Sequence, residues 1–215
     1  TTLFRSLMKD KLVLIGAGGY CRGVLDSLLL LDSYEIVGIT DPATPIGTDV
    51  YGISVLGTDD ILPKLFESGV KKAHITVGSV GNCSLRKKLV EMAENIGFEL
   101  VTIIDPNAVL AKDVRLGKMA YIGKSATINS DVEIGNYCII NTGSIIEHGC
   151  RIGNFVHVAP GSVLVGDIHV GNESHFGLNC SVLQGLTIGN RVIVGAGSTV
   201  LRNVNDGETV VGIVK

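Results

Sequence analysis

The C-terminal half of the chain carries a hydrophobic repeat in which every sixth residue is apolar and the register never changes. The repeated positions are Leu110, Leu116, Ile122, Ile128, Ile134, Ile140, Ile146, Ile152, Val158, Leu164, Val170, Phe176, Val182, Ile188, Val194 and Val200. An amphipathic helix repeats every ~3.6 residues and a half-buried strand about every 2, so neither explains this spacing. A period of six is typical of a hexapeptide β-helix, in which short strands surround a narrow core.

Two further features of the repeat favour a β-helix. Glycine directly follows many of the large residues, as at Gly117 and Gly135, and we expect it to supply the backbone angles of a corner. Small or slim residues such as Ala120, Cys138 and Ser162 precede many of the large residues by two positions. Each hexapeptide therefore offers one large and one small side chain to the interior.

The N-terminal half instead alternates short apolar runs with longer amphipathic ones. The expected strands are 11–15, 34–40, 53–56, 72–77 and 99–103, and the expected helices are 20–31, 59–68 and 85–97. Strands that alternate with helices predict a small parallel α/β domain with helices on the faces of the sheet.

These patterns divide the chain into three segments. We expect a Rossmann-like α/β domain at residues 1–105, a β-helix domain at 106–201 and a C-terminal tail at 202–215, with the first boundary near Asp105. The hexad fails at Asp206, so the tail is expected to leave the helix. Because a stack of repeats exposes its last unit, the α/β domain and the tail are expected to act as caps.

Composition excludes several classes of protein. The net charge of −3 comes without basic blocks, which argues against nucleic acid or an anionic membrane as partner. No apolar run approaches the ~20 residues of a membrane span, and the first ten residues lack the long apolar segment of a secretory signal. The five cysteines show no metal-ligand spacing, and free buried thiols fit the reducing cytoplasm.

A glycine-rich loop follows the first expected strand and precedes the first expected helix. Backbone amides in this context can hold a phosphate, and Gly16, Gly18 and Gly19 are the candidates. Cys21 stands where a dinucleotide fingerprint needs a third small residue, so the NAD signal is weak. Asp41 ends the second strand, near the expected place of a ribose-binding acid. A nucleotide or nucleotide-sugar site is favoured, and a tight packing turn is the alternative.

The segment 141–161 carries the most specific motif, N-T-x-x-x-I-E-H-x-C-x-I-G-x-x-x-H-V-x-x-G. It resembles the bacterial hexapeptide-repeat sugar acyltransferases of the sialic-acid O-acetyltransferase and UDP-4-amino-sugar N-acetyltransferase family. The resemblance extends to the glycine loop, to Asp41 and to the turn at Gly78. It implies a left-handed parallel β-helix in which three hexapeptides close one triangular coil. About five coils would then follow one another at roughly the 4.8 Å strand spacing.

The resemblance also implies roles for single residues. His148 matches the general base that takes a proton from the sugar amine or hydroxyl as it attacks the thioester of acetyl-CoA, and an imidazole suits this role because its pKa lies near working pH. Asn141 matches a position near the acceptor, and His157 matches one that contacts acetyl-CoA. The loop residues of the α/β domain (Gly16, Gly18, Gly19, Tyr20, Asp41 and Gly78) would bind the nucleotide-linked sugar.

The period of a coil places Gly166 directly above His148. A glycine there is expected to leave a notch for the thioester, and the CoA arm is expected to pass Gly166, Leu178, Gly195 and Ala196 along the edge of the coils. The resemblance further implies a homotrimer with active sites between subunits, and direct transfer without a covalent enzyme intermediate.

Three departures from the family pattern bear on activity. Gly149 stands where the family usually has an acid after the catalytic histidine; Tyr20 often corresponds to a histidine; and the C-terminus differs. Glu147, Asp131 and Asp167 are the acids that sequence or stacking places near His148 as substitutes.

Two alternatives remain beside an acetyltransferase of a nucleotide-linked bacterial sugar. The first is a catalytically weakened sugar-nucleotide or CoA-binding or scaffold protein of the same fold. The second is a zinc enzyme of the γ-class carbonic anhydrase type, because His157 and His175 are one coil apart. His169 falls on another face of the triangle and the family's histidine pairing is absent, so no metal is expected.

Overall fold

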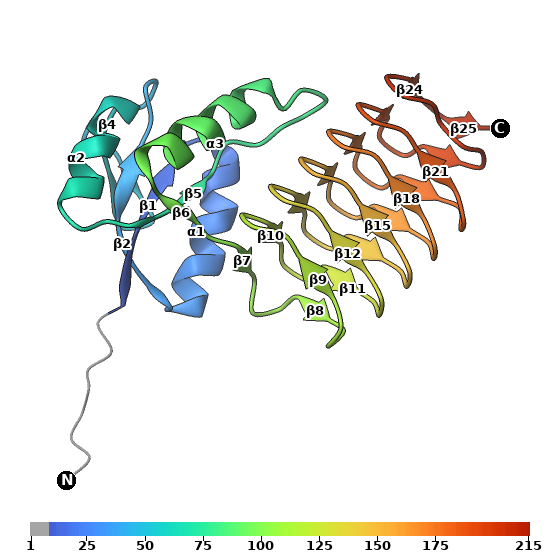
Figure 1. Cartoon of the computed structure of the whole chain (residues 1–215), viewed down its shortest axis with the longest axis horizontal. Coiled ribbons are helices and arrows are strands. Elements are labelled where there is room, and N and C mark those ends of the chain that lie inside the picture. Colours follow the sequence, from blue (N-terminus) through green and yellow to red (C-terminus); the bar gives the residue numbers. More distant parts are fainter. Residues whose placement is uncertain (1–8) are drawn as a thin grey trace, which may run out of the picture.

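The computed structural model describes residues 9–215, and the expectation about a secretory signal within the first ten residues therefore falls largely outside the described part. The chain forms an α/β domain followed by a regular triangular stack of coils, and the two lie side by side (Figure 1). No helix in residues 9–215 is long and apolar enough to cross a membrane.

The α/β domain is built on one sheet with the strand order β3-β4-β2-β1-β5-β6. Its strands are β1 (Asp10–Ile15), β2 (Tyr34–Thr40), β3 (Asp49–Val50), β4 (Ile53–Gly57), β5 (Lys72–Ile75) and β6 (Glu99–Leu100). Its helices are α1 (Gly19–Leu31), the 3₁₀ turn η1 (Asp59–Ile61), α2 (Leu62–Glu67) and α3 (Ser84–Ile96). All strand pairs are parallel except β3–β4, as the α/β alternation predicts.

Successive residues of β1 point to opposite faces of this sheet, so that both faces are apolar and both are covered by helices. Leu12 and Leu14 pack with α1 on one side, whereas Val13 and Ile15 pack with α2 and α3 on the other. Helix α1 ends at Asp32, which adopts the left-handed conformation (φ 51°) and donates its amide to the carbonyl of Leu28.

The rest of the chain is a parallel β-helix with three sheets of short strands. One sheet holds β7 (Ile103–Ile104), β10 (Tyr121–Ile122), β13 (Ile139–Ile140), β16 (His157–Val158), β19 (His175–Phe176), β22 (Ile193–Val194) and β24 (Thr209–Val210). The next holds β8 (Val109–Leu110), β11 (Thr127–Ile128), β14 (Ile145–Ile146), β17 (Val163–Leu164), β20 (Ser181–Val182), β23 (Thr199–Val200) and β25 (Ile213–Val214). The third holds β9 (Arg115–Leu116), β12 (Glu133–Ile134), β15 (Arg151–Ile152), β18 (His169–Val170) and β21 (Thr187–Ile188).

We call these the β7, β8 and β9 sheets. Within each sheet, a strand residue pairs with the residue eighteen positions later, as Tyr121 does with Ile139 and His157 with His175. Three hexapeptides therefore make one coil. The large residues of the repeat, from Ile122 to Val200, are buried in one continuous core, and the small residues such as Cys138 and Ser162 are buried beside them. The hydrophobic repeat thus predicted the core correctly.

The reason for the glycines that follow the large residues differs from the one expected. Gly117, Gly135 and Gly153 do not adopt positive φ. A Cβ at Gly135 would lie 2.7 Å from the side-chain oxygen of Asn154, one coil further on, and Gly117 and Gly153 face the same constraint. Contact between coils therefore requires glycine here. The positive φ angles instead fall two residues later in each hexapeptide, for example at Asp131, Gly149 and Asp167.

The C-terminal tail does not leave the β-helix as expected. Strands β24 and β25 pair in parallel with β22 and β23, so residues 202–215 continue two of the three sheets. On the third side of this last coil, where the repeat fails in the sequence, the only pairing among the described residues is a single bridge between Ile188 and Val204. At the other end, β7 already belongs to the β-helix, which therefore begins two residues before the expected boundary at residue 105.

Candidate active site

The six residues predicted to bind the nucleotide-linked sugar surround one cavity of about 370 Å³ in the α/β domain. They are Gly16, Gly18, Gly19, Tyr20, Asp41 and Gly78, and the wall is completed by Pro42, Ala43, Thr76, Val77, Leu85 and Leu89. We call this cavity the nucleotide pocket. Its position at the carboxyl ends of parallel strands is where open α/β sheets bind ligands.

The glycines of this pocket have different structural reasons. Gly16 has φ 109°, and a Cβ there would lie 2.6 Å from Cγ2 of Val77, so only glycine fits. A Cβ at Gly18 or Gly19 would meet nothing within 4 Å, so a side chain there would project into open space. Because Gly18 and Gly19 have no side chains, the first backbone turn of α1 is accessible to a ligand.

Asp41 shapes the loop of the nucleotide pocket. Its carboxylate accepts hydrogen bonds from the amides of Ala17 (2.7 Å), Ala43 and Thr44 (both 2.8 Å). Burial by itself would raise the pKa of Asp41, but these amide hydrogen bonds outweigh it and hold the pKa below its ordinary value. Asp41 is therefore ionised at neutral pH and locks the glycine loop to the end of β2.

A second cavity, of about 630 Å³, lies where the α/β domain meets the β-helix. It is lined by the predicted residues Asn141, His157, Leu178, Gly195 and Ala196, and by Val80, Gly81, Ala159, Pro160, His175, Gly177, Ile193 and Val194. We call it the acyl pocket. Sequence reasoning missed His175 as a lining residue, although its place one coil above His157 was the available signal. It also missed Val80 and Gly81, which come from the loop between β5 and α3.

His157 is held in one tautomer in the acyl pocket. Its Nδ1 lies 2.6 Å from the carbonyl oxygen of Ser79, and because a carbonyl only accepts, Nδ1 carries the proton. Burial, helped by the neighbouring His175 and Arg86, lowers the pKa of His157 to about 4, so the ring is neutral at physiological pH. Its Nε2 is therefore an acceptor, 3.4 Å from the side-chain nitrogen of Asn141.

His148 lies on a different edge of the prism, in the turn between β14 and β15. Its side chain is 62 % exposed, and Nδ1 is 3.5 Å from a carboxylate oxygen of Glu147. The ring lies over Gly166: a Cβ at Gly166 would be 2.6 Å from Nε2 of His148. Gly166 thus leaves no open notch within one chain, because the imidazole itself occupies the space.

The acids near His148 are also defined. A Cβ at Gly149 (φ 70°) would lie 2.1 Å from Oδ1 of Asp167, so the carboxylate of Asp167 occupies the space of a side chain at 149. Asp131, by contrast, is paired with Arg151 at 3.0 Å through both carboxylate oxygens. Of the three acids suggested by the sequence, Glu147 contacts the imidazole and Asp131 is engaged elsewhere.

The single chain does not bring all the predicted residues together. Gly166 follows β17 and lies on the edge between the β8 and β9 sheets, with His148. Leu178 and Ala196 follow β19 and β22 and lie on the edge between the β7 and β8 sheets, with Asn141. Within one chain these residues lie on two edges, because Gly166 and Leu178 are twelve residues apart, two thirds of a coil. A CoA path past all of them stays a prediction, and it involves two neighbouring chains.

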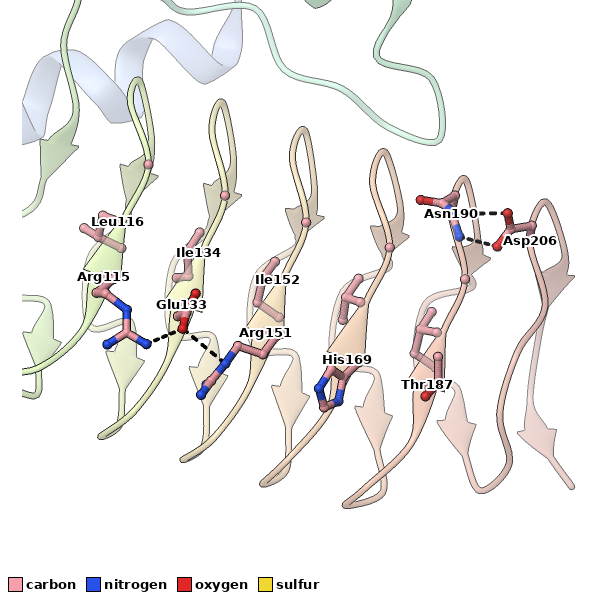
Figure 2. A pocket seen from close by; sticks show the side chains of 17 residues that line it. Arg115, Leu116, Glu133, Ile134, Arg151, Ile152, His169, Thr187, Asn190 and Asp206 are labelled. Atoms are coloured by element: carbon pink, nitrogen blue, oxygen red, sulfur yellow. Dashed lines mark hydrogen bonds and ion pairs between the residues drawn. The ribbon is translucent and has the colours of Figure 1, made fainter.

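A shallow groove of about 630 Å³ runs along the β9 sheet, away from every predicted site residue. The glycines at the end of each strand leave it hollow, and Figure 2 shows Arg115, Glu133 and Arg151 in line along it, followed by His169 and Thr187. Glu133 pairs with both arginines. Among the residues that line the groove, Arg115 and Arg151 are balanced by Glu133 and Asp206.

The zinc alternative is not supported by the arrangement of the histidines. The rings of His157 and His175 meet edge to face, with centroids 4.9 Å apart and an interplanar angle of 69°, whereas His169 is on the β9 sheet. Within residues 9–215, no group of three or more histidine, cysteine or acidic side chains is placed to hold a metal ion.

The fold and these sites define a class, the hexapeptide-repeat acyltransferases with an N-terminal α/β domain. Two family descriptions match the sequence, the PglD N-terminal domain at residues 11–93 and the GMPPB C-terminal domain at residues 88–183. No curated protein matches it. Among solved structures, a perosamine N-acetyltransferase variant from Caulobacter crescentus, in complex with CoA and GDP-perosamine, is 36% identical over 94% of both chains, with a TM-score of 0.89.

Two further solved structures are similar over nearly the whole chain. The acetyltransferase domain of PglB from Neisseria gonorrhoeae, in complex with acetyl coenzyme A, is 30% identical over 95% of this chain and 97% of that one (TM-score 0.87). WeeI from Acinetobacter baumannii is 26% identical over the same shares (TM-score 0.84). The chain belongs to the PglD-like family of sugar acetyltransferases, and is an acyltransferase with the expected left-handed parallel β-helix.

Proposed function

We propose that this protein transfers an acetyl group from acetyl-CoA to the amino group of a nucleotide-linked sugar. The observation that carries the proposal is the pair of cavities: one loop, residues 76–81, contributes to both the nucleotide pocket and the acyl pocket. The solved relatives that were crystallised with CoA and GDP-perosamine, or with acetyl coenzyme A, support the same two ligands. They are named as N-acetyltransferases or acetyltransferases, and we therefore favour an amine over a hydroxyl acceptor.

The residues of the acyl pocket suit the CoA arm. The arm carries amide groups, and Nε2 of His157 is a fixed acceptor for an N–H donor. Leu178, Gly195 and Ala196 offer an apolar and backbone surface beside it. Acetyl-CoA supplies the acetyl group as a thioester, and no covalent enzyme intermediate is needed.

His148 is proposed as the general base. With Glu147 at its Nδ1, the Nε2 lone pair is free to take the proton that the sugar nitrogen loses as it attacks the thioester carbonyl. A base in this role contributes roughly 10² to 10⁴ in rate. The acid missing at position 149 is not required in this arrangement, because Glu147 holds the opposite side of the ring.

The active site is proposed to form between subunits of a homotrimer. In one chain, His148 and the acyl pocket lie on the two opposite edges of the β8 sheet. Two neighbouring chains that meet along this sheet bring His148 of one chain close to the acyl pocket of the other. Val109 and Ile213, which are 62 % and 70 % exposed on the outer side of that sheet, become buried in such a contact. A cytoplasmic location, where acetyl-CoA is made, belongs to the same proposal.

The test is acetyl-CoA turnover, measured by thiol release with GDP-perosamine, UDP-4-amino sugars and CMP-sialic acid as acceptors. Turnover with an amino sugar supports the proposal, and turnover with CMP-sialic acid alone would show O-acetylation instead. If acetyl-CoA and nucleotides bind but none of these acceptors reacts, the binding or scaffold alternative gains.

His148→Ala is expected to reduce turnover by roughly 10² or more. The protein should keep its thermal stability, because the side chain is 62 % exposed. His169→Ala, an exposed histidine on the β9 sheet, is the matched control and should leave turnover unchanged. Comparable activity of the two variants would exclude His148 as the base.

A further inference from the structure

The loop between β5 and α3 reaches from the α/β domain toward the β-helix (Figure 1). Its first part, Thr76 to Gly78, lines the nucleotide pocket, and its next part, Val80 and Gly81, lines the acyl pocket. Ser79 lies between them and accepts the hydrogen bond from His157. One short segment is therefore the common wall of the two cavities.

Very few polar contacts hold this segment. In the described part of the chain, the backbone of residues 77–82 makes no hydrogen bond to other backbone groups. The carbonyl of Val77 accepts from Nη1 of Arg86 (2.9 Å), and the carbonyl of Ser79 accepts from His157 (2.6 Å). A segment with so few backbone bonds shifts at low free-energy cost.

Arg86 is an unusual anchor for the segment. It is 1 % exposed, lies in the first turn of α3 and also donates to the carbonyl of Ile75 (3.0 Å). Its Nε and Nη2 make no hydrogen bond of normal geometry among the described residues, and neither does the hydroxyl of Tyr20, whose ring packs against Gly78. This buried hydroxyl and the guanidinium are neighbours, and each influences the pKa of the other. Burying a guanidinium near a helix N-terminus lowers the free energy of unfolding, so packing alone does not explain an arginine at this position.

We infer that residues 77–81, anchored by Arg86, couple the two cavities, so that a ligand in the nucleotide pocket sets the position of His157 in the acyl pocket. Arg86 is the positioning residue: it fixes Val77 and, through the next two residues, the carbonyl that orients His157. A nucleotide that packs against Val77 and Gly78 then favours one arrangement of the segment, and CoA binds that arrangement more tightly. This inference rests on the function proposed above.

The test is a binding cycle with CoA and, as nucleotide probes, GDP and UDP. The affinity of the full-length protein for CoA is measured by calorimetry with and without each saturating nucleotide. We expect at least one nucleotide to raise CoA affinity about fivefold or more, the lower range of allosteric coupling. In Arg86→Met, both ligands should still bind, but the ratio of the two CoA affinities should fall to about one.

Lys88→Met, an exposed lysine on the same helix, is the matched control and should keep the wild-type ratio. CoA and nucleotide that bind wild-type protein independently would overturn the coupling and leave the proposed function intact. A wild-type ratio retained in Arg86→Met would overturn the role of Arg86. If CoA does not bind at all, the proposed function fails first, and the inference fails with it. The wild-type measurement decides the coupling even if Arg86→Met does not fold.

Discussion

Single residues in this protein are selected by contacts one coil away. Gly149 is the clearest case: the family acid is absent there, and the space for its side chain is taken by Asp167. Gly166 is the second case, because the imidazole of His148 lies where its side chain would be. In both cases a residue eighteen positions away decides what fits. The spacing of the sequence indicates which residue this is, but only the structure shows how closely the two approach.

Gly166→Ala should therefore lower kcat. Gly166 does not have positive φ, so alanine suits the backbone, but the new methyl group would lie within 3 Å of the His148 ring and displace it. Steady-state kinetics should show a loss in kcat of about tenfold or more, within the contribution of a general base. An unchanged kcat would mean that the imidazole leaves Gly166 when substrates bind.

His157 should make the stability of the protein depend on pH. Its pKa is lowered from 6.5 to about 4 in the folded state. Between these two pH values the imidazole is therefore protonated in the unfolded chain but neutral in the folded chain. Stability is lost as pH falls toward 4, by up to roughly 3 kcal/mol from this residue. His157→Gln should flatten the fall in Tm between pH 6.5 and 4. Burial also lowers the pKa of His74, to about 3. Part of the pH dependence of stability should therefore remain in both the wild type and His157→Gln.

At the scale of the element, the coils are joined by a ladder of side chains as well as by strands. The side-chain oxygens of Asn136, Asn154, Asn172 and Asn190 each accept the backbone amide of the residue eighteen positions earlier. Asp206 ends the ladder by accepting the amide of Asn190. This explains why Asp206, where the hexad fails, still belongs to the stack.

Asn172→Ala removes the acceptor for the amide of Asn154, which lies 2.8 Å from it. The cost should be about 1 kcal/mol of unfolding free energy. Asn129→Ala is the control, since that side chain makes no hydrogen bond within the described residues. Chemical denaturation of both variants measures the difference, and equal stabilities would show that water replaces the ladder bond freely.

At the scale of the whole molecule, the two edges of the β8 sheet divide the proposed active site. A trimer with shared sites predicts that chains of His148→Ala and His157→Ala, each inactive alone, regain activity when they are unfolded and refolded together. A mixed trimer has interfaces where an intact His148 meets an intact His157. Turnover that stays at the level of the single variants would show that each site lies within one chain.

The hydrophobic repeat by itself determined the β-helix, its core and the stacking of residues eighteen apart, because the pairing of strands copies the spacing of the sequence. In the N-terminal half, the alternation of apolar and amphipathic runs determined the α/β domain, whose parallel strand ends share the edge where the nucleotide pocket lies. Only the tertiary structure decided that the loop after β5 enters the acyl pocket and that its Ser79 carbonyl accepts a hydrogen bond from His157. It also decided that the tail pairs with the last coil. These features depend on contacts between residues whose spacing follows no period, and so no local pattern records them.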